Sequence, residues 1–211
     1  MKTKLSALAA GITLAFGANV AMAANDEANI YQNGYSNDAS IEQYDNNGAY
    51  ASVWTKGNDN DAVVVQRNVS NANADIYQNA YSGDATISQS SASHHYNAYN
   101  QYAFISQNSG WGNDAWVTQT GSNVDGGITQ SGYKNVAGIL QDGSHSGWSD
   151  ARINQSGSFN DGYIRQNGSR LEANINQTGK GNDAVILQTR SDHTAAITQV
   201  GNYNVGYVRQ H

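Results

Sequence analysis

The sequence predicts an all-β protein, a β-solenoid of about eight stacked strand-turn-strand rungs. Three observations predict this fold. First, the frame Q-x-G-x-x-N-x-A-x-I-x-Q, clearest from Gln177 to Gln188, recurs along the chain after residue 24. Second, apolar and polar residues alternate with a period of two inside each copy. Third, the 211 residues include no proline. Tandem repetition of one short unit is typical of solenoids, in which each unit buries its apolar face against the next.

The first 23 residues have the features of a secretory signal peptide. Residues 1–4 are basic, residues 5–17 form an apolar run, and Ala21-Met22-Ala23 supplies a small-x-small cleavage pattern. The apolar run is shorter than the roughly 20 residues that span a bilayer. We therefore expect a mature chain of residues 24–211, forming one domain outside the cytoplasm; an N-terminal core helix is the alternative.

Sixteen expected strands share the pattern small-x-β-branched-x-Gln. A period of two places these three positions on one face, which we expect to point inward. The predicted core positions are Ile30, Ile41, Val53, Val64, Ile76, Ile87, Ile105, Val117, Ile128, Ile139, Ile153, Ile164, Ile175, Ile186, Ile197 and Val208. The glutamines that follow them are Gln32, Gln43, Gln66, Gln78, Gln89, Gln107, Gln119, Gln130, Gln141, Gln155, Gln166, Gln177, Gln188, Gln199 and Gln210, with Thr55 as the single exception.

Every second strand follows a Gly-x-x-Asn turn, so the repeating unit is a pair of strands. The turn asparagines are Asn37, Asn60, Asn113, Asn135, Asn160, Asn182 and Asn204, and Gly83 interrupts the series. The unit is therefore about 22 or 23 residues long and occurs eight times. Two longer spacings, around residues 90–100 and 142–149, predict loops on one side of the solenoid.

Stacking at roughly 4.8 Å per rung would pair each strand with the rungs above and below it. Gln would then lie over Gln and Asn over Asn, and such amide ladders satisfy their own donors and acceptors. Glycine in the turns permits positive φ, and Asn tolerates that region better than most residues. The sequence also has no helical or charged cap at either end of the repeats, and an open strand edge is a template for another chain. We therefore expect the chain to polymerise with itself, rung on rung, into a cross-β fibre.

Composition excludes several other classes. The net charge of −6 disfavours a nucleic-acid partner, and the lack of cysteine excludes disulfides and thiolate metal sites. No nucleophile elbow, phosphate loop or paired-carboxylate cleft is present, so we predict no enzyme activity, no catalytic residue, no cofactor and no metal site. A polysaccharide lyase and a soluble ligand- or ice-binding solenoid are the more distant alternatives. His94, His95, His145 and His193 have no fixed carboxylate or cysteine ligand beside them.

With these repeats written out, the chain resembles the curlin family, the secreted subunits of bacterial curli. The Gln, Gly, Asn, Ala and closing Gln of the family pattern S-x5-Q-x-G-x2-N-x-A-x3-Q recur in nearly every unit from about Ala28 to Gln210. The resemblance implies a functional amyloid of the extracellular matrix, used in biofilm formation, adhesion and surface colonisation. It also implies a related curli subunit as partner, export through a dedicated outer-membrane pore, and periplasmic and surface accessory proteins.

The chain departs from the family pattern in two ways. The leading Ser is present only as Ser149, and the glycine-rich segment common near the mature N-terminus of the major subunit is missing. These departures leave two alternatives open, a bulk fibre subunit or a minor nucleating subunit.

Two surface features are candidates for functional roles. An acid follows the turn position in six units, at Asp38, Asp61, Asp84, Asp114, Asp161 and Asp183. Stacked like charges oppose assembly, so these are candidate gatekeepers that delay it; a calcium ladder is the alternative. The outward stripe Val63, Val65, Trp116, Leu140, Tyr163, Val185, Leu187 and Tyr207 either bundles fibrils and binds surfaces, or reflects sheet propensity and stacking between rungs.

Overall fold

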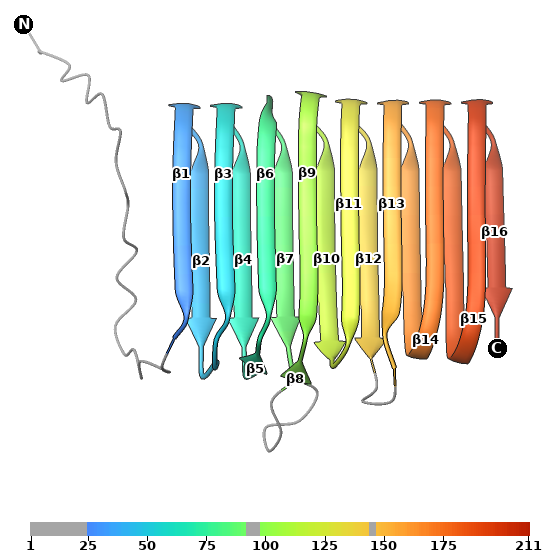
Figure 1. Ribbon diagram of the computed structural model, residues 1–211. Coiled ribbons are helices and arrows are strands. Elements are labelled where there is room, and N and C mark those ends of the chain that lie inside the picture. The colour runs from blue at the N-terminus through green and yellow to red at the C-terminus, as the bar shows by residue number, and fades with distance from the viewer. Residues whose placement is uncertain (1–24, 92–97, 144–146) are drawn as a thin grey trace, which may run out of the picture.

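The computed structural model describes residues 25–91, 98–143 and 147–211. The predicted signal peptide and three of the histidines, His94, His95 and His145, lie outside these residues. The described chain forms eight rungs, each made of two strand arms joined by a tight corner, and the rungs follow one another in a straight row (Figure 1). The prediction of an all-β solenoid is confirmed.

The first arms of the rungs form one parallel layer and the second arms form another. The first arms are β1 (Glu27–Tyr35), β3 (Tyr50–Asn58), β6 (Asn73–Tyr81), β9 (Gln101–Trp111), β11 (Val124–Tyr133) and β13 (Ser149–Ser158). The second arms are β2 (Asp38–Tyr44), β4 (Asp61–Arg67), β7 (Asp84–Ser90), β10 (Asp114–Gly121), β12 (Val136–Gly143) and β16 (Val205–Gln210). All pairings between neighbouring rungs are parallel, as a solenoid that always winds the same way requires.

Two long strands connect the layers. β14 (Asp161–Lys180) and β15 (Asp183–Asn202) each begin as the second arm of one rung and continue around a corner as the first arm of the next. The two layers therefore form a single 14-stranded sheet. A second, two-stranded sheet of β5 (Val69–Ser70) and β8 (Ala98–Tyr99) lies at the corner between successive rungs, where the sequence predicted no strand.

The core is the set of inward columns that the alternation predicts. Equivalent residues pair rung to rung, for example Ile128 with Ile153 and Gln130 with Gln155. The small and β-branched side chains from both layers form one apolar cluster, which is almost fully buried in the inner rungs. Ile30, Ile41 and Val208, in the terminal rungs, are only partly buried because each has a neighbouring rung on one side.

Close approach between neighbouring rungs at the corners explains why glycine occurs there. A Cβ at Gly34 would lie 1.6 Å from the carbonyl oxygen of Gly57 in the next rung, and the φ of Gly34 is +137°. The expectation that the turn asparagines share this backbone conformation is wrong. Positive φ belongs to the residue before each of them, such as Lys134 (φ 50°) and Phe159 (φ 56°). None of the turn asparagines has a positive φ, and their side chains bond the neighbouring rungs at the corner, as those of Asn135 and Asn160 do.

Irregularities in spacing appear as local changes in register. Gln107 and Gln119 are one residue further apart than the other pairs, and the extra residue, Asn108, is left out of the pairing between β9 and β11. The described flanks of the two longer insertions, at Tyr99 and Gly143, lie at the same end of the strands (Figure 1). The loops themselves lie partly outside the described residues.

Candidate functional site

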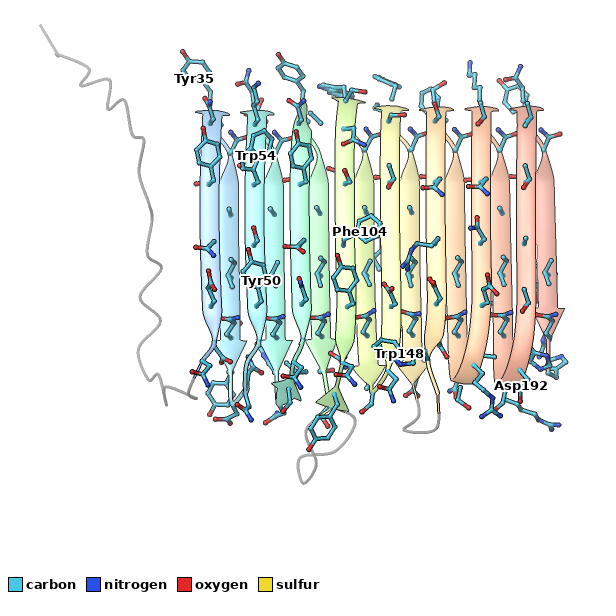
Figure 2. The ribbon with its side chains drawn as sticks, in the orientation of Figure 1. Tyr35, Tyr50, Trp54, Phe104, Trp148 and Asp192 are labelled. Carbon is cyan, nitrogen blue, oxygen red and sulfur yellow. The ribbon has the colours of Figure 1, made fainter. Side chains whose placement is uncertain are left out.

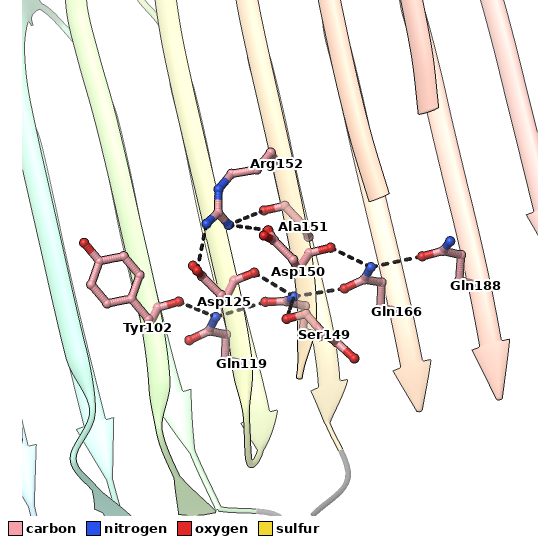
Figure 3. A network of polar contacts seen from close by, with 10 residues as sticks. Tyr102, Gln119, Asp125, Ser149, Asp150, Ala151, Arg152, Gln166 and Gln188 are labelled. Atoms are coloured by element: carbon pink, nitrogen blue, oxygen red, sulfur yellow. Dashed lines mark hydrogen bonds and ion pairs between the residues drawn. The ribbon is translucent and has the colours of Figure 1, made fainter. Parts of the chain in front are cut away.

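The second layer carries an unbroken ladder of glutamine amides. In each step the Nε2 of one Gln donates to the Oε1 of the Gln in the next rung, at 2.8 to 3.0 Å (Figure 3). The ladder runs through Gln43, Gln66, Gln89, Gln119, Gln141, Gln166, Gln188 and Gln210. The six inner members are buried, a position that an amide tolerates only when its hydrogen-bonding groups are used.

Each glutamine also joins the two layers. The Nε2 of Gln141 donates to the backbone oxygen of Asp125 at 2.9 Å, and the Nε2 of Gln166 donates to that of Asp150 at 2.9 Å (Figure 3). The first-layer glutamines do the same toward the second layer, as Gln177 does to Asp161 at 2.7 Å. The amide therefore holds a rung to its neighbour and one layer to the other.

The glutamine ladder of the first layer is interrupted once. It runs from Gln78 to Gln199 with steps of 2.8 to 3.2 Å. Thr55 separates Gln78 from Gln32 and is too short to continue the chain of amides. Among the described residues, the buried Oγ1 of Thr55 and Oε1 of Gln78 have no hydrogen-bond partner.

The turn asparagines form a ladder that runs in the opposite direction. The Nδ2 of Asn160 donates to the Oδ1 of Asn135 in the preceding rung at 3.1 Å, and the other complete steps measure 2.9 to 3.2 Å. The same Oδ1 also accepts the backbone N–H of Asn160. Gly83 interrupts this ladder, although its backbone N–H still donates to Asn60 Oδ1 at 3.0 Å.

The two ladder types give the solenoid a chemical direction. The rung that contains Gln210 and Asn204 ends with a glutamine donor and an asparagine acceptor facing outward along the stack. The rung that contains Gln43 and Asn37 ends with the complementary glutamine acceptor and asparagine donor. Both terminal rungs also leave one row of backbone groups unpaired in the described chain, since β1, β2 and β16 each pair on one side only.

The candidate gatekeeper acids stack as predicted. Asp38, Asp61, Asp84 and Asp114 occupy one column in four successive rungs, and Asp161 pairs with Asp183 in two later rungs. Desolvation and the neighbouring carboxylate raise the pKa of Asp84, beside Asp61, and of Asp114, beside Asp84. The same two causes raise the pKa of Asp161, beside Asp183. Val136 interrupts the column between Asp114 and Asp161, and Val205 ends it in the last rung.

The side chains of the outward stripe that runs from Val63 to Tyr207 are half-buried, and only Tyr207, at the open edge, is exposed. The ring of Trp116, for example, covers Gly138 in the next rung, where a Cβ would lie 2.3 Å from it. The interpretation that these residues pack between rungs is therefore supported for Trp116.

The outer face of the first layer carries an aromatic column that the sequence analysis missed. Tyr31, Trp54 and Tyr77 stack, with ring centroids 5.7 and 4.4 Å apart. The middle residue, Trp54, is labelled in Figure 2. Their spacing of 23 residues was the available signal. Beyond this column, Arg152 bonds Asp125 at 2.7 Å and Asp150 at 2.6 Å (Figure 3), and lies over the ring of Phe104.

Over the described ranges, no three His, Cys, Asp or Glu side chains come together in a way that could hold a metal ion. The same ranges contain no helix whose length and apolar character would let it cross a membrane. The features that remain as a candidate site are the amide ladders and the two open edges.

These features define a class of protein, a parallel β-solenoid whose rungs are joined by buried amide ladders. Comparison with protein families matches residues 149–179 and 168–201 to the curlin associated repeat. The chain thus carries curlin repeats, and its resemblance to the curlin family is confirmed. The other rungs share their columns with the matched ones in continuous register. No curated protein matches the chain.

Proposed function

We propose that the chain is a secreted structural subunit that assembles end to end into an extracellular, amyloid-like fibre. The observation that carries the proposal is the equivalence of the two open edges. Residues of the last rung, Ile197, Gln199 and Asn204, occupy the same columns as Ile30, Gln32 and Asn37 of the first. A second copy placed on the edge would continue every column and pair the open row of backbone groups.

The match to the curlin associated repeat supports the same proposal, because the role expected of curlin subunits is structural. Localisation at the cell surface, a part in biofilm and adhesion, and export by curli-type accessory proteins follow from this family as proposals for the chain. The proposed partner is another copy of the chain, together with a related subunit. The second candidate function is that of a minor subunit that nucleates the same fibre.

The direct test is incubation of purified residues 24–211 at neutral pH. We expect thioflavin-positive fibres that diffract at roughly 4.7 Å along the fibre axis and seed their own monomer. A matched control is Gln141→Leu, which breaks the ladder inside the molecule. A stable monomer that shapes ice or cleaves a glycan would reject the proposal. Strong acceleration of a partner subunit by substoichiometric amounts of this chain would favour the nucleating role.

We also propose that the six stacked acids delay assembly. Their mutual repulsion is present in the folded rungs and is smaller in the unfolded chain, where the carboxylates are further apart. Replacement of Asp38, Asp61, Asp84, Asp114, Asp161 and Asp183 by Asn should shorten the lag before fibres appear. An unchanged lag in this variant would contradict the proposed role.

A further inference from the structure

We propose that charge pairs fix the direction of the joint between two copies, with the acidic first rung of one copy stacked on the last rung of another. Within this joint, Glu42 lies against Arg209 and Asp26 lies against His193. The inference rests on the proposed end-to-end assembly and goes beyond it, because it states which edges meet and which side chains select them.

The two terminal rungs differ sharply in charge. The first rung, residues 25–46, carries Asp26, Glu27, Asp38, Glu42 and Asp45 and has no Lys, Arg or His. The last rung, over the equivalent residues 192–211, carries Arg209, His193 and His211 and a single acid, Asp192, which is paired with Arg170 of the preceding rung. Two first rungs facing each other would bring ten carboxylates together, whereas a first rung on a last rung brings opposite charges together.

The register of the solenoid assigns the pairs. Glu42 begins a column that continues through Val65, Ser88, Thr118, Leu140, Arg165 and Leu187 and ends at Arg209. One further rung in this register places Glu42 of the next copy directly against Arg209. The corner between successive rungs gives a second pair. His193 of the last rung lies in register with Leu171 of the rung before it, and Asp26 occupies the same corner position in the first rung.

Glu42 and Arg209 are both positioned to meet at the joint. Glu42 already bonds Arg67 on its inner side at 3.0 Å, and both side chains are more than half exposed. Arg209 is exposed and forms no ion pair with any described residue. Stacking would therefore place the Glu42 carboxylate between two guanidinium groups, that of Arg209 in its own column and that of Arg67, which reaches it from the neighbouring column.

The pair of Asp26 and His193 and the remaining columns also fit a first rung stacked on a last rung. Half-buried His193 has a buried Nε2 with no partner among the described residues, and Asp26 is half-buried at the matching corner. Asp38 would meet Val205, so the column of acids does not continue across the joint. The Nε2 of Gln210 would point toward the Oε1 of Gln43, which continues the direction of the ladder inside the molecule.

Two variants with reversed charge test the joint by seeded elongation, in which fragmented fibres are extended by monomer and followed by thioflavin fluorescence. Arg209→Glu reverses the charge at position 209 of the last rung without breaking an ion pair inside the molecule. Glu42→Arg with Arg67→Glu reverses the charge at position 42 of the first rung and keeps an ion pair between positions 42 and 67. We expect each to elongate its own seeds about three- to tenfold more slowly than the unmodified chain, because an exposed attraction becomes a repulsion. High salt should reduce this difference.

The matched control is Arg165→Glu, which makes the same charge change in the same column but inside the stack. The decisive experiment mixes the two reversed variants, since each presents an edge complementary to the other. The mixture should elongate at close to the unmodified rate, as should a chain that carries all three substitutions. Equal slowing by Arg209→Glu and Arg165→Glu, or no recovery in the mixture, would overturn the proposed joint. Failure of the unmodified chain to form fibres would instead reject end-to-end assembly itself.

Discussion

Gln78 lies directly over the position of Thr55 in the first layer, and both side chains are left with a buried oxygen that has no partner among the described residues. Every other rung holds a glutamine in this column, and from Gln78 to Gln199 each amide bonds the next one. The pair therefore marks the one place where the first-layer ladder is interrupted. A buried polar atom without a hydrogen bond destabilises a folded protein by about 1 to 3 kcal/mol.

Replacing Thr55 by Gln should stabilise the folded chain. The new Nε2 can donate to Gln78 Oε1, and the new Oε1 can accept from Gln32, so we expect a gain of about 1 to 2 kcal/mol. The shift in the midpoint of guanidinium unfolding measures it. Thr55→Val serves as the control, since it removes the unpaired hydroxyl without restoring the ladder and should gain less. Equal effects of the two substitutions would argue against the ladder as the cause.

Breaking the intact ladder of the second layer should have the opposite effect. Gln141→Leu keeps most of the side-chain volume but leaves the Oε1 of Gln166 without its donor and one N–H of Gln119 without its acceptor, while the Nε2 of Gln119 keeps its bond to the backbone oxygen of Tyr102. We expect a loss of roughly 2 to 5 kcal/mol, because two buried groups lose their partners. Asn33→Leu, at an exposed position of the first rung, is the control and should change the unfolding midpoint little.

The stacked acids should make stability depend on pH in a defined direction. Burial and neighbouring carboxylates raise the pKa of Asp84, Asp114 and Asp161, so these groups bind protons more readily in the folded chain than in the unfolded one. Their contribution to stability therefore rises as the pH falls through the raised pKa, and levels off below the ordinary value of 3.8, where the unfolded chain is also protonated.

The test compares the unmodified chain with a variant in which these three residues are Asn. The variant should be more stable at neutral pH by about 1 kcal/mol, a modest gain because the carboxylates are partly exposed and screened by solvent. It should also gain less stability than the unmodified chain on acidification from about pH 7 to about pH 4, just above the ordinary carboxyl pKa of 3.8. Urea unfolding at the two pH values measures both effects; a parallel pH response in the two proteins would contradict the assignment.

The corner positions with positive φ offer a test of backbone strain. Ser82 has φ of 50° in a column that contains glycine at Gly112 and Gly181. Ser82→Gly should stabilise the chain by about 0.5 to 1 kcal/mol, because glycine adopts this conformation without a steric cost. Ser88→Gly, inside β7, is the control and should destabilise by a similar amount, since glycine weakens a strand interior. Thermal unfolding of both variants would separate the corner effect from a general effect of glycine.

Much of the fold could be predicted from the repeat alone. A period of two places Ile153 and Gln155 on one face of a strand, and tandem repetition places equivalent residues in adjacent rungs. The ladders of the candidate site followed from the same pattern. The aromatic column of Tyr31, Trp54 and Tyr77 carried an equally regular signal at the outward positions, but its stacking depends on ring orientations that spacing does not specify.

Sequence by itself determined which residues point inward, how many rungs there are and which amides stack, because these follow from strand alternation and repeat length. Only the tertiary structure decided the direction of each ladder, since a given amide can donate to either neighbour until the geometry of the corner selects one. It also decided that the residue before the turn asparagine takes the positive φ, and that Thr55 leaves Gln78 unpaired. These properties depend on where neighbouring rungs place their carbonyl oxygens, which only the assembled stack defines.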